Sequence, residues 1–339
     1  MPSTPSRRAT IAEVAALAGV STATVSRVLS GGSPVTESTR SRVEAAVEEL
    51  HYRPSELTRA VFAGHSNTIG VLLADMRNPY YIDLIEGVSR VANEAGALPY
   101  LAAGNRDSTT ERRLLTLMDS HHVRGVVTTV ANDNEDILHA MAMAGTECVF
   151  MTRDPSIDHP RMHSVRLDDQ AAGRLAWDHI ASIGRTKVLI VQQSRDLVTV
   201  RERTAGMIER ARSQGVEIGP ANIFKLASLD RPSEELRDRI QRGFADGSID
   251  VVFATTGIAT FRAYEALAAT TLEVPGDVAM LGLDDFAWAE YLSPSLSVIK
   301  QPTIDMGATA ARLILEEPGE SRRLTFEPTL AIRGSTTVR

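Results

Sequence analysis

The residues from Ser21 to Arg27 combine a helix-capping hydroxyl, a first turn of small or polar side chains, and an arginine. Ser21 is a good N-cap for a helix, and the turn that follows, Thr22 to Thr24, carries no large apolar side chain. Such a helix end can enter the major groove of DNA, where each base pair displays its own pattern of donors and acceptors. These residues therefore predict hydrogen bonds to base edges.

Presenting a helix end in this way requires a small scaffold, and residues 10 to 20 supply its first part. Thr10 and Glu13 form a capping box, because the threonine hydroxyl can accept the third helical N–H while the glutamate reaches back to the Thr10 amide. Gly19 then ends the first helix. The pattern predicts two short helices joined by a glycine-containing turn, which is a helix-turn-helix.

Apolar side chains at helical spacing should hold this scaffold together. Val25 and Val28 of the second helix can face Val14 and Leu17 of the first. Residues 36–50 supply a third helix with an apolar stripe, which ends before a proline because proline disfavours helix in the preceding residue. We expect a small closed bundle of three helices.

Charge is distributed unevenly along the 339 residues, whose formal net charge is −7. Residues 1–64 hold seven Arg and six Glu without Lys or Asp, so a weakly positive segment precedes an acidic remainder. This asymmetry is consistent with DNA contact confined to the N-terminal segment. A solvated scatter of charge explains it equally well, so the helix spacing is the stronger evidence.

The composition is typical of a globular protein with two or three domains. The chain has no apolar run long enough to span a bilayer and no apolar stretch typical of a signal peptide. Its single cysteine, Cys148, lies in an apolar run and is expected to be buried in a strand. We expect a cytoplasmic protein without membrane contact.

Five different short motifs stand in the first 70 residues, at residues 11–15 (IAEVA), 19–21 (GVS), 23–29 (ATVSRVL), 52–54 (YRP) and 66–70 (SNTIG). Together they resemble the lactose-repressor (LacI/GalR) family of bacterial transcription regulators. The resemblance implies base contacts by Thr22, Ala23 and Arg27, and phosphate contacts by Thr10, Ser21, Thr24, Ser26 and Thr39. Arg27 can donate two hydrogen bonds to a guanine, whereas Ala23 offers only a methyl contact, so specificity should depend heavily on Arg27.

Residues 55–64 resemble the hinge helix of the same family, which folds when two copies meet on DNA and inserts an apolar side chain into the minor groove. A segment of about two turns is too short to stay helical alone in water. The resemblance places the hinge and minor-groove contacts at Leu57, Thr58 and Val61. Val61 stands where leucine is usual, so the depth of insertion is open, and a linker residue packed on the body is the alternative.

Beyond residue 65, short apolar runs alternate with helical stretches in a βαβ rhythm. The expected strands are residues 68–74, 98–103, 125–130, 147–151, 187–191, 251–254 and 278–282. The expected helices are residues 80–95, 111–121, 169–183 and 203–214. This pattern predicts two parallel sheets covered by helices, with a binding crevice beyond the carboxyl ends of the strands, so the fold class is α/β with an all-α head.

Further motifs extend the resemblance over nearly the whole chain, among them residues 78–81 (NPYY), 203–206 (RTAG), 281–285 (LGLDD) and 333–336 (RGST). It implies a head at 1–54, a hinge helix at 55–64 and a periplasmic-binding-protein-like body at 65–339. Lobe one should hold about 67–165 and 297–327, and lobe two about 166–296 and 328–339. No leucine heptad extends past Arg333, which favours a homodimer over a tetramer.

The resemblance also implies an effector site formed by Tyr80, Tyr81, Arg153, Thr199, Arg203, Thr255 and Asp284. Aromatic faces can pack on a small ligand, while Arg203 and Asp284 can hydrogen-bond its hydroxyls or charged groups. Two alternatives stay open: the tyrosines could be core aromatics, and Arg203 could form a salt bridge with Asp284. Thr255 stands where many sugar-responsive relatives carry Asn-Asp, so the class of effector is open. A sugar, a sugar phosphate, an organic acid and a nucleoside-like molecule are all candidates. An anionic effector is a hypothesis suggested by Arg153 and Arg203.

The sequence lacks the common nucleophile-elbow, phosphate-loop, dinucleotide and Cys-x-x-Cys motifs. We therefore expect no enzyme, cofactor or metal site. The best prediction is a homodimeric transcriptional repressor that binds double-stranded, pseudo-palindromic operator DNA under control of a small-molecule effector. The alternative is a cytoplasmic ligand-binding or enzymatic α/β protein with a vestigial DNA-binding head, which would not select a palindrome from random DNA.

Overall fold

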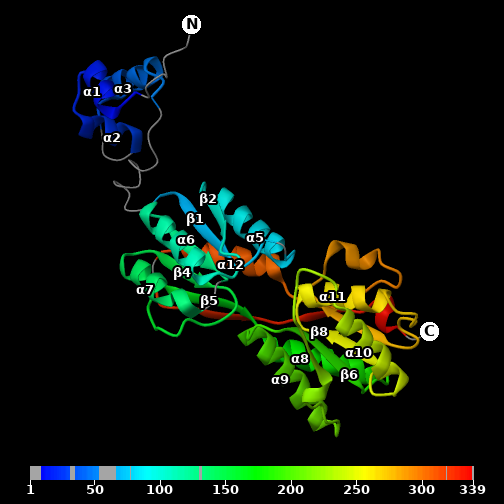
Figure 1. Cartoon of the computed structure of the whole chain (residues 1–339). Helices are drawn as coiled ribbons and strands as arrows, with labels where there is room; N and C mark the ends of the chain where they lie inside the picture. Colours follow the sequence, from blue (N-terminus) through cyan, green and yellow to red (C-terminus); the bar gives the residue numbers. More distant parts are fainter. Residues whose placement is uncertain are drawn as a thin grey trace. The chain divides into compact units, whose positions relative to one another are not determined.

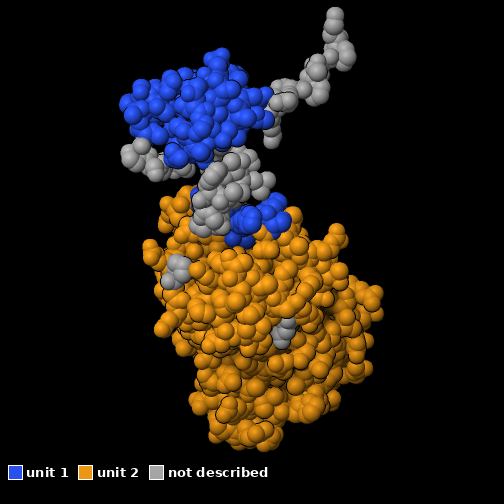
Figure 2. Space-filling model, turned by 90° about the vertical axis from the view of Figure 1, so that its left-hand side faces the viewer, with its two compact units in different colours: residues 1–67, 120–123 blue, residues 68–119, 124–339 orange. Residues whose placement is uncertain are grey.

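The computed structural model describes residues 9–30, 35–52, 66–76, 78–129, 132–317 and 319–337. The chain divides into two compact units, residues 1–67 with 120–123 and residues 68–119 with 124–339, which Figure 2 distinguishes by colour. The described residues of the first unit form helices without strands, and both sheets belong to the second unit.

Three short helices open the chain: α1 (Ile11–Ala18), α2 (Thr22–Ser30) and α3 (Glu37–Glu49) (Figure 1). The predicted capping box is present, since the Thr10 amide donates to Glu13 Oε2 at 2.7 Å and the Glu13 amide donates to Thr10 Oγ1 at 3.4 Å. Gly19 follows α1 with a φ of 62°, a left-handed conformation that glycine adopts without strain. The Ser21 hydroxyl accepts the Thr24 amide at 3.1 Å, which confirms Ser21 as the cap of α2.

A small apolar core joins these helices through Val14 of α1, Val25 of α2 and Val43 of α3. The expectation that Leu17 faces the second helix is wrong, because this side chain is 47% exposed. The buried stripe of α1 runs through Val14 and Ala18, and Leu17 lies roughly 80° of helical rotation from its centre. Position relative to the stripe, rather than hydrophobicity, decides which side chain is buried.

A six-stranded sheet forms lobe one of the second unit. Its strands are β1 (Thr68–Leu73), β2 (Leu98–Ala103), β3 (Gly125–Thr128), β4 (Glu147–Phe150), β5 (Met162–Leu167) and β11 (Arg323–Phe326). Its helices are α5 (Tyr80–Glu94), α6 (Ser108–Ser120), α7 (Glu135–Met143) and α12 (Thr303–Leu315), with a short 3₁₀ helix η1 (Asn132–Asn134). The strands run parallel in the order β11-β5-β4-β3-β1-β2. Side chains of α5 and α12, including Leu84 and Met306, fill the core on one face.

A second six-stranded sheet forms lobe two. Its strands are β6 (Val188–Gln193), β7 (Ile223–Leu226), β8 (Val251–Ala254), β9 (Ala279–Leu283), β10 (Ser297–Lys300) and β12 (Thr329–Ala331). Its helices are α8 (Asp169–Ser182), α9 (Val198–Ser213), α10 (Glu234–Ala245) and α11 (Gly257–Ala268), with short 3₁₀ helices η2 (Pro220–Asn222), η3 (Ala287–Glu290) and η4 (Gly334–Thr336). The order is β12-β10-β9-β8-β6-β7, and only β12 runs antiparallel among its described pairs. Separate apolar clusters beneath α8 and α9 and beneath α10 and α11 cover the two faces.

The chain crosses between the lobes three times, after β5, before α12 and between β11 and β12. The second crossing differs from the expected one near residue 297. Ser297–Lys300 is strand β10 and pairs with β9 of lobe two, so the chain leaves lobe two only after Lys300. A four-residue apolar run carries no local signal for which sheet it joins, because pairing depends on the neighbouring strand.

The expected strands are all present, and each begins and ends within two residues of its predicted bounds. Helix α9 begins at Val198, ahead of the expected residue 203. Cys148 is buried in β4, as predicted. Within the described residues no single helix is long and apolar enough to cross a membrane, and α1 and α2 pass such a test only as a pair bent by 100°.

Candidate functional site

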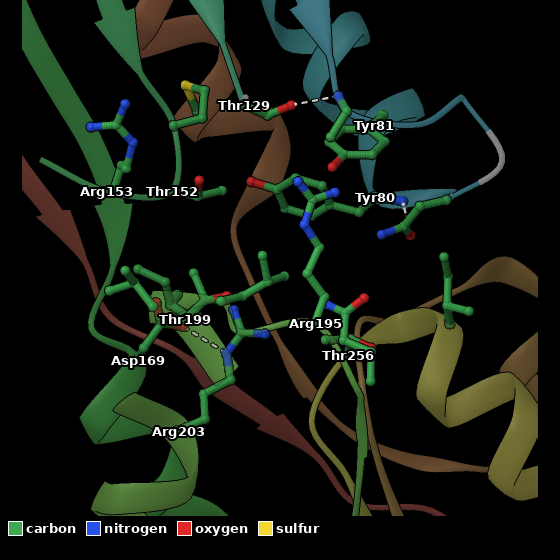
Figure 3. Close-up of a pocket in the computed structure, with 18 of the residues that line it drawn as sticks. Tyr80, Tyr81, Thr129, Thr152, Arg153, Asp169, Arg195, Thr199, Arg203 and Thr256 are labelled. Atoms are coloured by element: carbon green, nitrogen blue, oxygen red, sulfur yellow. Dashed lines mark hydrogen bonds and ion pairs between the residues drawn. The ribbon is translucent and has the colours of Figure 1, made fainter. Parts of the chain in front are cut away.

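A cavity of about 420 Å³ is lined by residues of both lobes (Figure 3). Its wall includes Thr129 after β3, Gln193 at the end of β6 and Thr256 after β8. The crevice predicted beyond the carboxyl ends of the strands is therefore present. The cavity mixes apolar side chains with charged and hydroxyl groups, as small-molecule sites do.

Helices α8 and α9 bring Asp169 and Arg203 together in the wall of this cavity. Their backbones approach closely at Gly173, where an added Cβ would lie 2.0 Å from the Arg203 carbonyl oxygen. Arg203 Nε donates to Asp169 Oδ1 at 2.6 Å, and its Nη1 donates to the Thr255 carbonyl at 2.8 Å. Burial raises the pKa of Asp169 to about 6, although the neighbouring Arg203 charge opposes the rise. Arg203 thus pairs with Asp169 and not with Asp284.

Asp284 follows β9 in a left-handed backbone conformation, with a φ of 68° that is uncommon outside glycine. Its Oδ2 accepts the amide of Gly257 at 3.1 Å, and its Oδ1 accepts Gln301 Nε2 at 2.6 Å. Burial raises the pKa of Asp284, and Arg203 is the largest opposing influence. The carboxylate is held from two elements and still has lone pairs for a ligand hydroxyl.

Tyr80 and Tyr81 begin α5 and line the cavity from lobe one. Their rings meet edge to face, with centroids 5.3 Å apart and an interplanar angle of 74°. In Figure 3 both hydroxyls point toward the cavity. Burial is the main cause that raises the pKa of each hydroxyl, so both stay protonated at neutral pH. The tyrosines are largely buried and also form part of the cavity wall, so they are compatible both with a role as core aromatics and with a role in ligand contact.

Arg153 follows β4 and contributes to the cavity lining, but its guanidinium is turned away from the other labelled side chains in Figure 3. Its Nη1 donates to Glu135 Oε2 at 2.6 Å and to the Asp154 carbonyl at 3.1 Å. The guanidinium also lies over the Phe150 ring, 4.7 Å from its centroid. Arg153 is therefore part of the cavity wall, with one guanidinium nitrogen held by Glu135 and the other two without a hydrogen-bond partner in the described residues.

The threonine that lines the cavity after β8 is Thr256 and not the predicted Thr255. Thr255 is fully buried, and its hydroxyl donates to the Val191 carbonyl at 3.3 Å, so it is not part of the cavity wall. Thr256 lines the cavity instead and caps α11 by accepting the Ala259 amide at 3.2 Å. Thr255 directly follows strand β8 and its side chain is buried, whereas Thr256, at the N-cap of α11, faces the cavity. Thr199 of α9 lines the cavity as expected.

Sequence reasoning did not assign Asp169, Gln193, Arg195 or Gln301 to this cavity, although all four line it. Asp169 opens α8, where a carboxylate is stabilised by the N-terminal end of the helix. Their common signal is position, because each stands at the end of a strand or within two residues of one. The described residues contain no group of three or more His, Cys, Asp or Glu that could hold a metal ion.

The residues predicted to contact DNA lie on the surface of the helical bundle. Ala23 and Arg27 are exposed four residues apart on α2, a spacing that places them on one face of the helix, and Thr22 is exposed beside them. The predicted phosphate contacts are exposed or partly exposed, namely Thr10, Ser21, Thr24, Ser26 and Thr39. Leu57, Thr58 and Val61 lie outside the described residues.

Two family profiles match the chain. Residues 10–55 match bacterial regulatory proteins of the lacI family, and residues 66–328 match the periplasmic binding proteins and sugar binding domain of the LacI family. Similar proteins include the HTH-type transcriptional regulator CelR of Thermobifida fusca, 30% identical over 97% of this chain and 98% of its own. The HTH-type transcriptional repressor PurR of Aliivibrio fischeri is 29% identical over 98% of this chain and 99% of its own.

Solved structures show the same arrangement of elements. The CelR–cellobiose complex has a TM-score of 0.70 and 29% identity, and the match covers 97% of this chain and all of that one. The lac repressor dimer bound to operator and the anti-inducer ONPF has a TM-score of 0.77, with 98% of this chain and all of that one covered. At 21% identity, the second likeness concerns the fold alone.

Proposed function

The chain belongs to the lacI family of bacterial regulatory proteins, and on this premise we propose that it is a repressor that binds a pseudo-palindromic operator as a homodimer. The observation that carries the proposal is the capped helix α2 of a closed three-helix bundle, which exposes Thr22 and Ala23 in its first turn and Arg27 one turn after Ala23. In this proposal residues 1–54 are the DNA-binding head, 55–64 the hinge helix and 65–339 the body that binds effector and partner. Thr10, Ser21, Thr24, Ser26 and Thr39 contact phosphates.

A homodimer is supported by an apolar surface at one edge of lobe one. Ile82 of α5 and Leu98 of the edge strand β2 are 61% and 57% exposed, and Leu101 of β2 and Leu117 of α6 are also exposed. We propose that a second copy covers this surface, because two heads must be held together to read two half-sites. The lac repressor, which shares the fold, is a dimer in its operator complex.

The charge pattern of the cavity supports an uncharged, hydroxylated effector such as a sugar. Four of its five arginines already have carboxylate partners: Arg106 with Asp75, Arg153 with Glu135, Arg201 with Asp196 and Arg203 with Asp169. The fifth, Arg195, is exposed, so water already solvates its charge. Asp284 faces the cavity without an arginine partner in the described residues. An anionic ligand would meet this uncompensated carboxylate, whereas hydroxyls can both donate to it and accept from the arginines. An uncharged sugar is thus favoured over the sugar phosphate and organic acid alternatives.

The proposed effector contacts come from both lobes. Tyr80 and Tyr81 supply aromatic faces and hydroxyls from lobe one, while Thr199, Arg203 and Asp284 supply hydrogen bonds from lobe two. Thr256 replaces Thr255 in this set. A ligand that touches both sets changes the free energy of one lobe orientation relative to others, and through the hinge segments it changes DNA affinity.

The test is selection of duplexes from random DNA by the full-length protein, followed by titration of the selected duplex with cellobiose, other uncharged sugars, and sugar phosphates or organic acids of similar size. We expect a two-fold symmetric site, and release or tightening by an uncharged sugar alone. Failure to enrich any symmetric duplex overturns the repressor proposal. A response confined to anions overturns the effector class while leaving operator binding intact.

A further inference from the structure

The loop between β6 and α9 carries an arginine whose side chain reaches the opposite lobe. Arg195 belongs to lobe two, and its Nη1 donates to the carbonyl oxygen of Arg106 in lobe one at 3.4 Å. In Figure 3 its side chain extends from this loop toward Tyr80. Arg195 is exposed and lines the cavity, so the contact lies at the edge of the cavity and not in a core.

The receiving carbonyl is presented by a strained turn. Asn105 and Arg106 have φ values of 52° and 62°, both left-handed and neither a glycine. The turn closes where the Asp107 amide donates to the Gly104 carbonyl at 3.0 Å, and the Arg106 guanidinium pairs with buried Asp75 at 2.5 Å. Two consecutive residues of this kind cost free energy, and such strain is retained mainly where it serves a site. Here it fixes the direction of the Arg106 carbonyl.

A buried acid of lobe one lies within electrostatic reach of the same side chain. Glu111, in the first turn of α6, is only 2% exposed and lines the cavity. Burial raises the pKa of Glu111, and Arg195 is the first influence that opposes this rise. Arg195 thus has an acceptor and a negative charge in lobe one.

The other arginines of the cavity behave differently. Arg106 and Arg153 pair with acids of lobe one, while Arg201 and Arg203 pair with acids of lobe two. Within the described part of the chain Arg195 has no carboxylate within ion-pair distance in its own lobe. The positive charge of Arg195 is therefore best compensated when the lobes are close enough for it to reach the Arg106 carbonyl and Glu111 of lobe one.

We propose that Arg195 is a positioning residue that tethers lobe two to lobe one across the cavity and narrows the range of lobe angles before any effector binds. The proposal rests on the effector cleft proposed above, since a tether there would set how readily a ligand enters and leaves. It needs no contact between Arg195 and the ligand. It concerns the lobe angle of the free protein, which is measurable without effector or DNA.

The test is a distance measurement between two spin labels in the full-length protein, without ligand. Labels are attached at Met143→Cys on α7 of lobe one and Arg212→Cys on α9 of lobe two, two exposed positions away from the cavity, while Cys148 is buried and stays unlabelled. Double electron–electron resonance then compares the parent with Arg195→Ala and Arg195→Glu. The matched control is Arg201→Ala, which removes an arginine of the same cavity whose partner Asp196 lies in its own lobe.

We expect the distance distribution of Arg195→Ala to widen and to shift to longer distances. The distribution of Arg195→Glu should shift further, because the introduced carboxylate faces Glu111. The distribution of Arg201→Ala should match that of the parent. An Arg195→Ala distribution identical to the parent overturns the tether. Equal shifts in Arg195→Ala and Arg201→Ala also overturn it, because they indicate a general effect of charge. Unchanged far-ultraviolet circular dichroism checks that each variant is folded. Failure of the parent protein to select DNA would reject the repressor proposal and leave this measurement valid.

Discussion

Single residues in the cavity owe their properties to burial combined with one or two fixed partners. Asp169 is held by Arg203, and Asp284 is held by the Gly257 amide and Gln301. Each carboxylate would be costly to bury alone, so its partners both retain its charge and orient its free lone pairs. Both carboxylates are therefore oriented before a ligand arrives, and such preorganisation lowers the cost of binding.

The pKa of Asp169 makes a testable prediction about pH. Its folded-state value of about 6 lies above the ordinary 3.8, mainly because of burial, so the folded protein binds this proton more tightly than the unfolded chain does. The contribution to stability is fully present below pH 3.8 and is lost as the pH rises through 6. A shift of this size corresponds to about 3 kcal/mol.

The measurement is a ¹³C NMR titration of aspartate carboxyl carbons, with Asp169 assigned by the signal missing in Asp169→Asn. Urea unfolding of both proteins should show the wild type losing stability relative to the variant between acidic and neutral pH. A carboxyl titrating near the ordinary value of 3.8 would contradict the prediction, because it would mean that the Arg203 interaction cancels the effect of burial.

Arg27 is the residue on which the predicted base preference depends most. Replacing it with alanine should weaken operator binding by about 1–3 kcal/mol and flatten the preference at one base pair in each half-site, because two hydrogen bonds to a guanine are lost. Binding of a randomised half-site library by wild type and Arg27→Ala measures both effects. Arg42→Ala, which removes an exposed arginine of α3, should keep the base preference. Retained preference in Arg27→Ala would show that another residue reads that base pair.

At the scale of secondary-structure elements, each lobe contains a helix pair packed backbone to backbone through glycines. In lobe two, Cβ atoms at Gly173 of α8 and Gly206 of α9 would lie within 2.2 Å of backbone oxygens of the other helix. In lobe one the same holds for Gly87 of α5 and Gly307 of α12, within 2.3 Å. These contacts set the positions of the first turns of α5 and α8 and of Arg203 on α9, which carry cavity residues.

Gly173→Ala tests this packing. A methyl group there must push α9 away from α8, so we expect a loss of stability of about 1–3 kcal/mol and a weaker effector response because Arg203 moves relative to Asp169. Urea unfolding and effector titration of operator complexes measure the two effects. Gly219→Ala is the control, because its added Cβ would meet open space and its φ is −102°. Equal behaviour of the two variants would contradict the proposed role of the contact.

At the scale of the whole molecule, the two lobes are joined by three chain crossings, and the cavity lies where the strands of both sheets end. Gln301, next to one crossing, donates to Asp284, so a ligand bound to this carboxylate is one hydrogen bond from a segment that joins the lobes. In the function proposed above, an effector that favours one lobe angle would change operator affinity, and the operator would change effector affinity by the same factor, a coupling typically worth about 1–3 kcal/mol. The dimer proposed at Ile82 and Leu98 would combine the responses of two such bodies.

The sequence alone determined the elements that depend on local chemistry. The capping box at Thr10 and Glu13, the left-handed Gly19 and the Ser21 cap are recognisable because each interaction spans three or four residues. The apolar strands were found for a similar reason, since buried parallel strands are short continuous apolar runs. The family motifs also led to Tyr80, Tyr81, Arg203 and Asp284, all of which line the cavity.

The pairing of side chains within the cavity depends on packing between elements that are far apart in the chain. Arg203 chooses Asp169 over Asp284 because two glycines let α8 and α9 touch, a contact between residues more than thirty positions apart. Arg153 pairs with Glu135 of α7, Thr256 lines the cavity in place of Thr255, and β10 pairs with β9 of lobe two, and each outcome depends on the elements packed beside that residue or strand. Caps and strands depend on near neighbours in the chain, whereas the partner of a buried charge depends on which elements the packing brings together.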